Sequence, residues 1–256
     1  MFLTPADEGF AHQTSLPLMM VANSDPNWRE RYWFSVQDVE GKDFILTGGF
    51  GKYPNKDVIE ACVMVQHGDR QWNVRASRQL LPDVGRIPAG PFNAEIIEPY
   101  RHLRFRLDEN ESGVSYDLRW RADTPAMLED RHFEVNRARV THDIIRYVQL
   151  GRMEGTVRFD GNVRELSLEG GWAERDHSWG LRPMAPLPGD PPVASSEWNF
   201  LAFCPIQFPS FVLHVYLFEA QAGDPTHVSA LIHYRDGRHQ GDRIVTIDHD
   251  LVWDFN

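Results

Sequence analysis

The sequence predicts an all-β protein made of antiparallel strands, and two kinds of observation support this fold class. Polar and apolar residues alternate in runs such as His102–Leu107 and Asp117–Arg121, which places one set of side chains on each face of a sheet. Glycine, asparagine, aspartate and proline interrupt the runs at hairpin length, for example at Asp160–Asn162 and Asp236–Arg238. Many antiparallel strands joined by short turns indicate a sandwich or a barrel.

Taken in chain order, the alternating and apolar runs define the expected strands. Helices are expected at most near 4–12 and 23–30, and 143–150 is compatible with either a helix or a strand. The expected strands are 30–38, 43–51, 57–66, 70–78, 92–98, 101–108, 113–121, 130–136, 143–159, 163–175, 197–204, 210–220, 226–235 and 243–254.

A weak seam near residue 150 predicts two domains. The stretch Ala122–Ala126 interrupts the strand pattern, and Gly151–Gly155 begins a new one. We expect an N-terminal β-barrel over 1–150, which has enough strands to close, and a second β unit over 151–256 with fewer strands. The second unit is open, or a partner chain completes it as in a homodimer, or the natural chain continues beyond Asn256. We expect the last of these.

The charge balance excludes some classes of partner. Lysine and arginine number 26 against 37 aspartates and glutamates, a formal net charge of −11. Such a chain is not expected to bind nucleic acid or anionic membranes. No run approaches the roughly 18 apolar residues of a membrane-spanning helix, and the N-terminus has no secretory signal pattern, so we expect a cytoplasmic protein without membrane insertion.

Cys62 and Cys204 lie in apolar runs and are expected to be buried thiols, with a disulfide between them left open.

The late strands are apolar on both faces. In Ser210–Phe218 one face would carry four apolar side chains, while the other would include His214 and Tyr216 among apolar neighbours. A histidine and a tyrosine in such a set are typical of an apolar pocket with a few polar groups. The alternative is that both are core side chains with satisfied hydrogen bonds.

The segment Gly170–Arg182 combines two tryptophans, two arginines, two acids and a histidine within one short run. If it is extended, alternate residues share a face. One face would then carry Trp172, Glu174, Asp176 and Ser178, and the other Arg175, His177 and Trp179. Three interpretations remain open, namely a structural cluster of ion pairs, a functional site and a surface loop.

This run resembles a known signature. The residues from Glu174 to Gly180 are similar to the Tyr-His-Asp-His-Asn-Trp-Gly signature of the AttH-like, carotenoid 1,2-hydratase-like proteins. Asp176, His177, Trp179 and Gly180 match it, whereas an arginine replaces its first histidine and a serine its asparagine. The Asp-His-Ser-Trp-Gly form looks like a bacterial branch of that group, which also includes kievitone hydratase and lipocalin-like pericyclases.

The resemblance implies a pair of lipocalin-like β-barrels or sandwiches, with the signature beside an apolar cavity near their interface. The second barrel would be incomplete in this chain. The hydratases of that group add water to a C=C bond without a cofactor, and its pericyclases hold a polyene in a reactive conformation.

The residues suit such chemistry. Asp176 is the candidate acid if burial raises its pKa, and His177 the candidate group that holds or deprotonates water. The alternative for Asp176 is an ion pair with Arg175 or Arg182, which would keep the carboxylate ionised. The expected ligand-binding residues are Trp172, Glu174, Arg175, Trp179, Arg182, His214 and Tyr216.

No cofactor or metal is expected. The sequence has no glycine-rich phosphate loop and no closely spaced histidine or cysteine pair. The leading hypothesis is therefore a protein that encloses a hydrophobic small molecule, of the terpenoid, steroid or polyketide class, and catalyses hydration, dehydration or isomerisation. The alternatives are a non-catalytic carrier of such a ligand and a structural or interaction protein.

Overall fold

The computed structural model describes residues 8, 14–39, 43–136, 138–182, 200–221, 223–236 and 241–250. Strands dominate this part of the chain, so the all-β prediction is confirmed. The chain divides into two units, Met1–Met184 and Ala185–Asn256, which are described separately below. The strands of the first unit are β1 (Trp28–Asp38), β2 (Phe44–Tyr53), β3 (Val58–His67), β4 (Arg70–Gln79), β5 (Phe92–Glu98), β6 (His102–Leu107), β7 (Ser115–Ala122), β8 (Met127–Leu128), β9 (His132–Asn136), β10 (Arg139–Phe159), β11 (Asn162–Leu166) and β12 (Gly171–Leu181).

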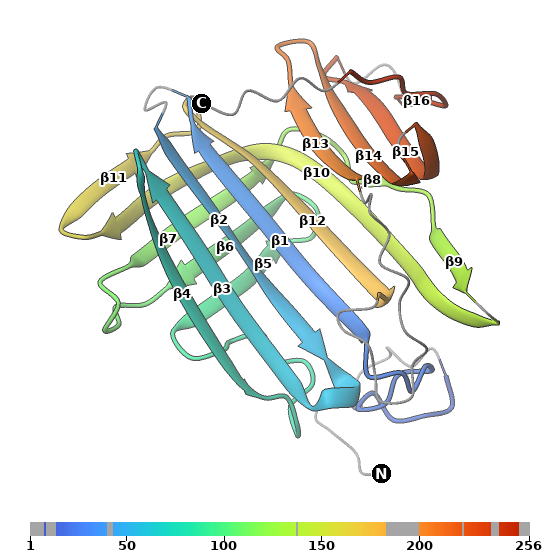
Figure 1. Cartoon of the computed structure of the whole chain (residues 1–256). Helices are drawn as coiled ribbons and strands as arrows, with labels where there is room; N and C mark the ends of the chain where they lie inside the picture. The colour runs from blue at the N-terminus through green and yellow to red at the C-terminus, as the bar shows by residue number, and fades with distance from the viewer. Residues whose placement is uncertain are drawn as a thin grey trace. The chain divides into compact units, whose positions relative to one another are not determined.

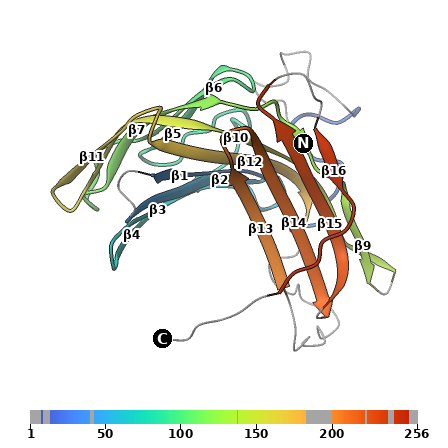
Figure 2. The ribbon, with the colours of Figure 1, turned by 90° about the horizontal axis from the view of Figure 1, so that it is seen from above.

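The first unit is built on one curled antiparallel sheet. Its main strands lie in the order β4-β3-β2-β1-β12-β10-β7-β6-β5, and the short strands β8, β9 and β11 also pair with β10. Figures 1 and 2 show the sheet curving round into a half-barrel, with β4 and β5 at its edges. The central pairings of β12 with β1 and β10 join segments that are far apart in the sequence. They place the signature strand in the middle of the sheet.

Large aromatic side chains fill the inner face of this half-barrel. Phe34, Phe105 and Trp120 are at most 1% exposed, and the rings of Phe34 and Phe105 stack with centroids 4.1 Å apart. Side chains at alternate positions point away from this core. Cys62, between two core residues of β3, is for that reason exposed, and Cys204 is exposed as well, so the prediction that both thiols are buried was wrong.

Two features of the middle of the chain differ from expectation. The domain boundary expected near residue 150 falls inside β10, whose 21 residues pair with β7 and with β12, and the chain divides instead after Met184. The strand expected over 163–175 is two strands, because the turn before Gly171 ends β11 and starts β12. The ambiguous stretch 143–150 is strand, within β10.

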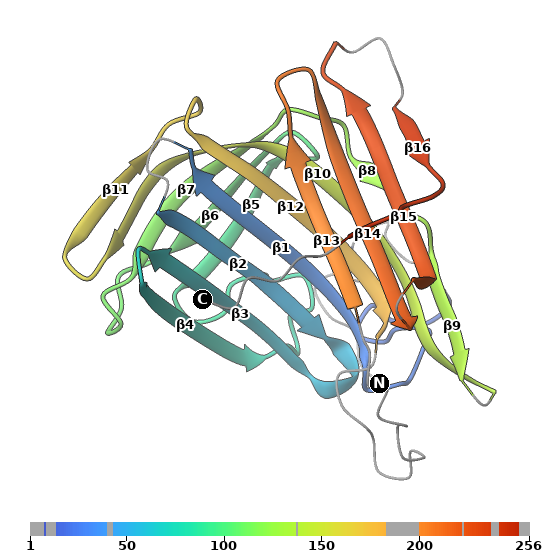
Figure 3. The same cartoon turned by 45° about the horizontal axis from the view of Figure 1, so that its top comes forward.

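The second unit contains a smaller antiparallel sheet in the order β13-β14-β15-β16, as Figure 3 shows. Its strands are β13 (Phe200–Gln207), β14 (Phe211–Gln221), β15 (Asp224–Tyr234) and β16 (Asp242–Ile244). The expected last strand, 243–254, is limited to β16 among the described residues, and 251–256 lie outside them.

The expected helices are not found where the structure describes the chain. Of 4–12 only Glu8 is described, and of 23–30 the first five residues are irregular or turn while the last three are the start of β1. A 3-10 turn, η2 (Pro54–Lys56), joins β2 to β3, and none of the described helical segments has the length and hydropathy needed to cross a membrane.

A glycine in β10 permits close approach of β7, which yields a first prediction. Gly155 has φ +130°, and a Cβ atom there would lie 2.1 Å from the carbonyl oxygen of Asp117. We expect Gly155→Ala to lower the free energy of unfolding by about 2–4 kcal/mol, because both backbone strain and a backbone clash are introduced. Urea denaturation would measure the loss.

The matched control is Gly161→Ala. Gly161 also has a positive φ, +76°, but a Cβ atom there would meet nothing within 4 Å. This variant is expected to lose only about 1 kcal/mol, the cost of the backbone conformation. Equal losses in the two variants would show that the approach of β7 does not require a glycine in β10.

Candidate functional site

The signature residues lie on β12, and the strand divides them between two faces. Ala173 belongs to the buried core, so Arg175, His177 and Trp179, at the same parity, lie on the inner face of the half-barrel. Trp172, Glu174, Asp176 and Ser178 lie on the opposite face. The two candidate catalytic residues, Asp176 and His177, therefore project to opposite sides of the sheet. They cannot act together on one reacting atom.

His177 is held at both ring nitrogens. Its Nε2 lies 2.9 Å from Oε1 of Glu30, and its Nδ1 lies 3.2 Å from the hydroxyl of Tyr147. The ring of Tyr32 stacks on the imidazole with centroids 3.9 Å apart. These contacts follow from register, because Tyr32 of β1 and Tyr147 of β10 are the cross-strand neighbours of His177.

Glu30 is ionised, so it gives the His177 imidazole a negatively charged partner. Burial alone would raise the pKa of Glu30, but hydrogen bonds from His177 and Lys52 and their positive charge lower it to about 2. The Lys52 ammonium lies 2.8 Å from the Glu30 carboxylate. Glu30 is thus an anion at neutral pH, placed to orient His177.

Arg175 is the second buried group of the network. Its side chain is 2% exposed; Nη1 donates to the Tyr147 hydroxyl at 3.2 Å and Nη2 donates to Oε1 of Gln149 at 2.6 Å. The guanidinium also lies over the ring of Trp120, 4.7 Å from its centroid. Arg175 faces away from Asp176, so it does not form the ion pair with Asp176 that the sequence left open.

Tyr147 is where these contacts meet. Its hydroxyl accepts a hydrogen bond from Arg175, contacts His177 and interacts with the Tyr32 hydroxyl. Burial, together with the contact to Tyr147, raises the pKa of the Tyr32 hydroxyl well above its usual range, so Tyr32 remains a donor. The cluster of Glu30, His177, Tyr147, Arg175 and Tyr32 is called the tyrosine network below.

A cleft of about 770 Å³ adjoins the tyrosine network through Tyr100 and Gln149, which both line it. The Gln149 amide donates to the Tyr100 carbonyl at 2.7 Å, and the ring of Tyr100 lies edge-on to that of Tyr147, with centroids 5.5 Å apart. Tyr100 has φ 62°, a strained conformation for a non-glycine residue. The remaining residues that line the cleft are Glu98, Pro99, Arg101, His102, Arg121, Ala122, Asp123, Thr124, Pro125 and Ala126.

The signature residues do not line the cleft. A second cavity, of about 370 Å³, lies near Glu109 and Asn162, and neither cavity is lined by any of residues 172–182. Large core side chains fill the half-barrel beside Ala173. Trp179 itself is 37% exposed, with its ring edge-on to His177 at 5.4 Å.

The opposite face of β12 carries two unusual carboxyl groups. Burial, with the nearby charge of Asp176, raises the pKa of Glu174 to about 8. Burial also raises the pKa of Asp176 to about 6, against the lowering effect of Arg146, whose Nη1 lies 4.0 Å away, and of Arg182. Arg146 is itself hydrogen bonded to Glu129 at 2.7 Å. Its charge is thus shared and only partly offsets the desolvation of Asp176.

Three other predicted ligand-binding residues, Trp172, His214 and Tyr216, pack against neighbouring side chains. Trp172 lies under Arg152, whose guanidinium is 4.1 Å from a ring centroid. His214 and Tyr216 lie on β14 of the second unit and are 0% and 6% exposed. Phe203 contacts both rings there, with centroids 4.9 and 6.3 Å away. Their surroundings within the second unit are those of core side chains.

The sequence did not identify Glu30, Tyr32 or Tyr147. None of them belongs to the signature, and 147 positions separate Glu30 from His177. The only signal available was parity, since Glu30 and Tyr32 share a face of one strand, and Tyr147 and Gln149 share a face of another.

The network has the elements of an acid–base site. With His177 neutral, the Tyr147 hydroxyl can donate to Nδ1 while Nε2–H donates to Glu30. If the Tyr147 proton moves to Nδ1, the ring donates to both partners, and the Tyr147 oxygen keeps the hydrogen bond from Arg175. The geometry therefore accommodates the proton on either side of the tyrosine–histidine contact.

Comparisons with known proteins show the fold and a family. A candidate AttH protein from Nitrosomonas europaea superimposes with a TM-score of 0.60 and 12% sequence identity, over 84% of this chain and 68% of that chain. Kievitone hydratase from Nectria haematococca gives a TM-score of 0.50 and 12% identity, over 79% of this chain and 60% of that chain. At such identities the likeness shows the fold, which is that of AttH-like proteins. No curated protein matches the sequence, whereas the model of a family described as "Family of unknown function (DUF8625)" matches residues 3–253.

Proposed function

The chain belongs to the family of unknown function DUF8625, and for this member we propose cofactor-free acid–base catalysis on a hydrophobic small molecule. The observation that carries the proposal is the position of the Tyr147 hydroxyl, between the Arg175 guanidinium and the His177 imidazole. Tyr147 would be the group that gives a proton to the substrate. His177, oriented by Glu30, would return it.

The strength of the acid selects the reaction class. An unperturbed tyrosine has a pKa of about 10, so it is a poor donor to an isolated alkene, whose protonation gives a carbocation. Such a group suits proton transfer to an enolate or to a carbon next to a carbonyl, where the charge that develops is delocalised onto oxygen. We therefore propose hydration, dehydration or isomerisation at a double bond conjugated with a carbonyl group.

Each step conserves atoms and charge. In hydration, the Tyr147 hydroxyl passes its proton to Nδ1 of neutral His177 and takes a proton from water, whose oxygen attacks the β-carbon while the electron pair of the double bond moves towards the carbonyl. Tyr147 then protonates the α-carbon, and the imidazolium passes its proton to the phenolate, which restores both residues. Dehydration is the reverse, and isomerisation uses the same two groups without water.

The aromatic side chains and the comparisons support a hydrophobic ligand. Tyr100 on the cleft, and Trp179 beside His177, present aromatic surface next to the tyrosine network. One protein with a similar fold is described as a kievitone hydratase, which is consistent with a hydratase-like reaction. A terpenoid, steroid or polyketide that carries a conjugated ketone would combine both requirements.

Tryptophan fluorescence tests ligand binding at this place. We expect a panel of conjugated terpenoid, steroid and polyketide ketones to contain ligands that quench the wild-type fluorescence in a saturable manner. Trp179→Phe should remove most of that quenching, because Trp179 lies 5.4 Å from the His177 ring and is partly exposed. Trp72→Phe is the matched control, since Trp72 packs against Phe159, 5.2 Å away in centroid distance.

The outcomes separate catalysis from transport. Quenching that survives in Trp179→Phe and disappears in Trp72→Phe would place the ligand elsewhere and contradict the proposed site. Incubation with each ligand that binds, followed by mass spectrometry and chromatography, would detect gain or loss of water or a change of isomer. Saturable binding without conversion of any ligand would identify a carrier instead of an enzyme.

A further inference from the structure

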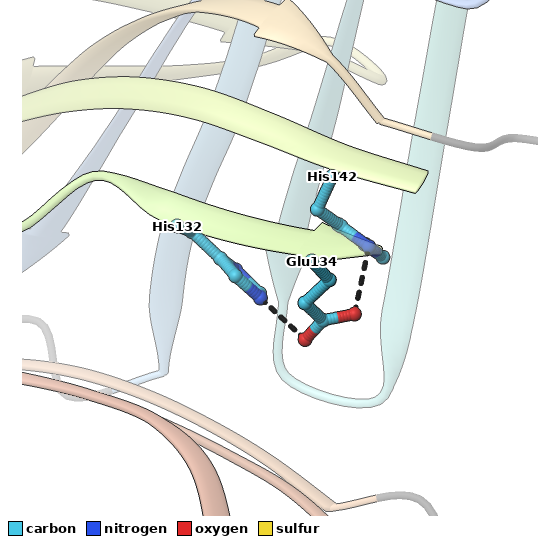
Figure 4. A group of neighbouring side chains, drawn as sticks. All are labelled: His132, Glu134 and His142. Atoms are coloured by element: carbon cyan, nitrogen blue, oxygen red, sulfur yellow. Dashed lines mark hydrogen bonds and ion pairs between the residues drawn. The ribbon is translucent and has the colours of Figure 1, made fainter. Parts of the chain in front are cut away.

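A second cluster of polar side chains lies in the hairpin of β9 and β10, apart from the tyrosine network. It consists of His132 and Glu134 on β9 and His142 on β10, as Figure 4 shows. The His132 Nε2 lies 2.7 Å from one carboxylate oxygen of Glu134, and the His142 Nδ1 lies 3.0 Å from the other. The two imidazole rings stack, with centroids 4.8 Å apart and an angle of 9° between them. The three side chains thus present their donor atoms to a common point.

A β-bulge brings these residues together. Val140 pairs with Val135, but His142 pairs with Glu134, so the register shifts across Thr141. Regular pairing would have placed Thr141 opposite Glu134, and His142 on the other face. The extra residue instead puts His142 directly across from Glu134, diagonal to His132. His132 and Glu134 share a face because they are two positions apart on β9.

The donor set and its compactness match a transition-metal site. Two imidazole nitrogens and one carboxylate are the protein ligands of many zinc sites, in which a fourth position holds water or another ligand. Ligands of a tetrahedral zinc ion lie roughly 3.3 Å apart, given bond lengths of about 2.0–2.1 Å. The donor atoms of this cluster all lie within 4.8 Å of one another. Small side-chain rotations would bring them into that range.

We propose that His132, Glu134 and His142 form a binding site for a divalent transition-metal ion of the zinc class. The sequence led us to expect no metal, because it has no cysteine pair and no two histidines at the close spacing of common zinc motifs. Hard cations such as Mg²⁺ prefer oxygen ligands and are disfavoured by two imidazoles. The site is independent of the proposed acid–base reaction, since none of its residues belongs to the tyrosine network.

Metal titration of the full chain, purified without a histidine tag, tests this proposal. Calorimetry with Zn²⁺ and visible absorption with Co²⁺ should show saturable binding of one ion, with the absorption of a four-coordinate Co²⁺ that Zn²⁺ displaces. His142→Ala and Glu134→Gln should each weaken Zn²⁺ binding at least about 100-fold, because outer-shell partners alone are worth 10–100-fold. Mg²⁺ should give no binding.

His67→Ala is the matched control, because His67 forms a comparable pair with Asp43, at 3.1 Å, in another part of the sheet. It should bind Zn²⁺ like the wild type. Circular dichroism of each variant checks the fold, and Glu134→Gln keeps the size of the side chain if His142→Ala does not fold. Absence of saturable Zn²⁺ binding by the wild type, or unchanged affinity in Glu134→Gln, would overturn the proposal and leave a hydrogen-bonded triad.

Discussion

Replacing Tyr147 with phenylalanine is expected to reduce turnover of a converted ligand by about 10²–10⁴-fold while ligand binding changes little. The substitution removes one oxygen atom, and with it the proposed proton donor and its contacts to Arg175 and His177. His177→Gln should cause a loss of similar size, because the proton can no longer return to Tyr147. Steady-state kinetics would measure kcat and KM for each variant.

The double variant sharpens this test. If Tyr147 and His177 act as one proton-transfer unit, combining the two substitutions should cost little more than either alone. If the two substitutions had independent structural effects, the fold-losses of turnover in the single variants would multiply in the double variant.

Tyr116→Phe is the control for loss of a buried tyrosine hydroxyl. Tyr116 is 3% exposed, and its hydroxyl has no hydrogen-bond partner among the described residues. Turnover should remain at the wild-type level.

Asp176→Asn distinguishes the two faces of β12, because Asp176 projects away from His177. If Asp176→Asn abolished turnover and Tyr147→Phe did not, the reaction would belong to the opposite face and the proposed site would be wrong.

Replacing Glu174 with glutamine is expected to stabilise the protein at alkaline pH by about 3–5 kcal/mol. Burial raises the pKa of Glu174 from 4.5 to about 8 in the folded chain. Between these two pH values the unfolded chain has released the proton while the folded chain retains it. The free energy of unfolding must therefore fall as pH rises through this window, and it levels off above the folded pKa. Glutamine stays neutral throughout and removes that fall.

Urea denaturation at a series of pH values would measure the effect. Asp176, with a pKa of about 6, contributes a similar fall at lower pH, so the difference between variant and wild type is clearest above about pH 6.5. Glu111→Gln, at an exposed position, is the control and should leave the wild-type pH dependence in place. A Glu174→Gln variant that follows the wild-type curve above that pH would show that Glu174 is ionised in the folded chain.

Local chemistry made part of the site predictable. The alternation of β12 correctly separated Arg175, His177 and Trp179 from Glu174 and Asp176, because side-chain direction in a strand depends only on position. The same rule located nearly all strands, since hydrophobic periodicity and turn residues are local properties. It did not locate the domain boundary, because a strand can run through a sequence seam when both of its halves find partners, as β10 does.

The sequence by itself determined the all-β class, the strand positions and the faces of the signature strand. Only the tertiary structure decided which distant residues meet those faces, namely Glu30, Tyr32 and Tyr147 at His177. It also decided that a bulge at Thr141 brings His142 to Glu134. The physical reason is that the period of a strand is set by its own backbone. The choice of neighbouring strand and its register are set instead by hydrogen bonding and packing across the whole sheet.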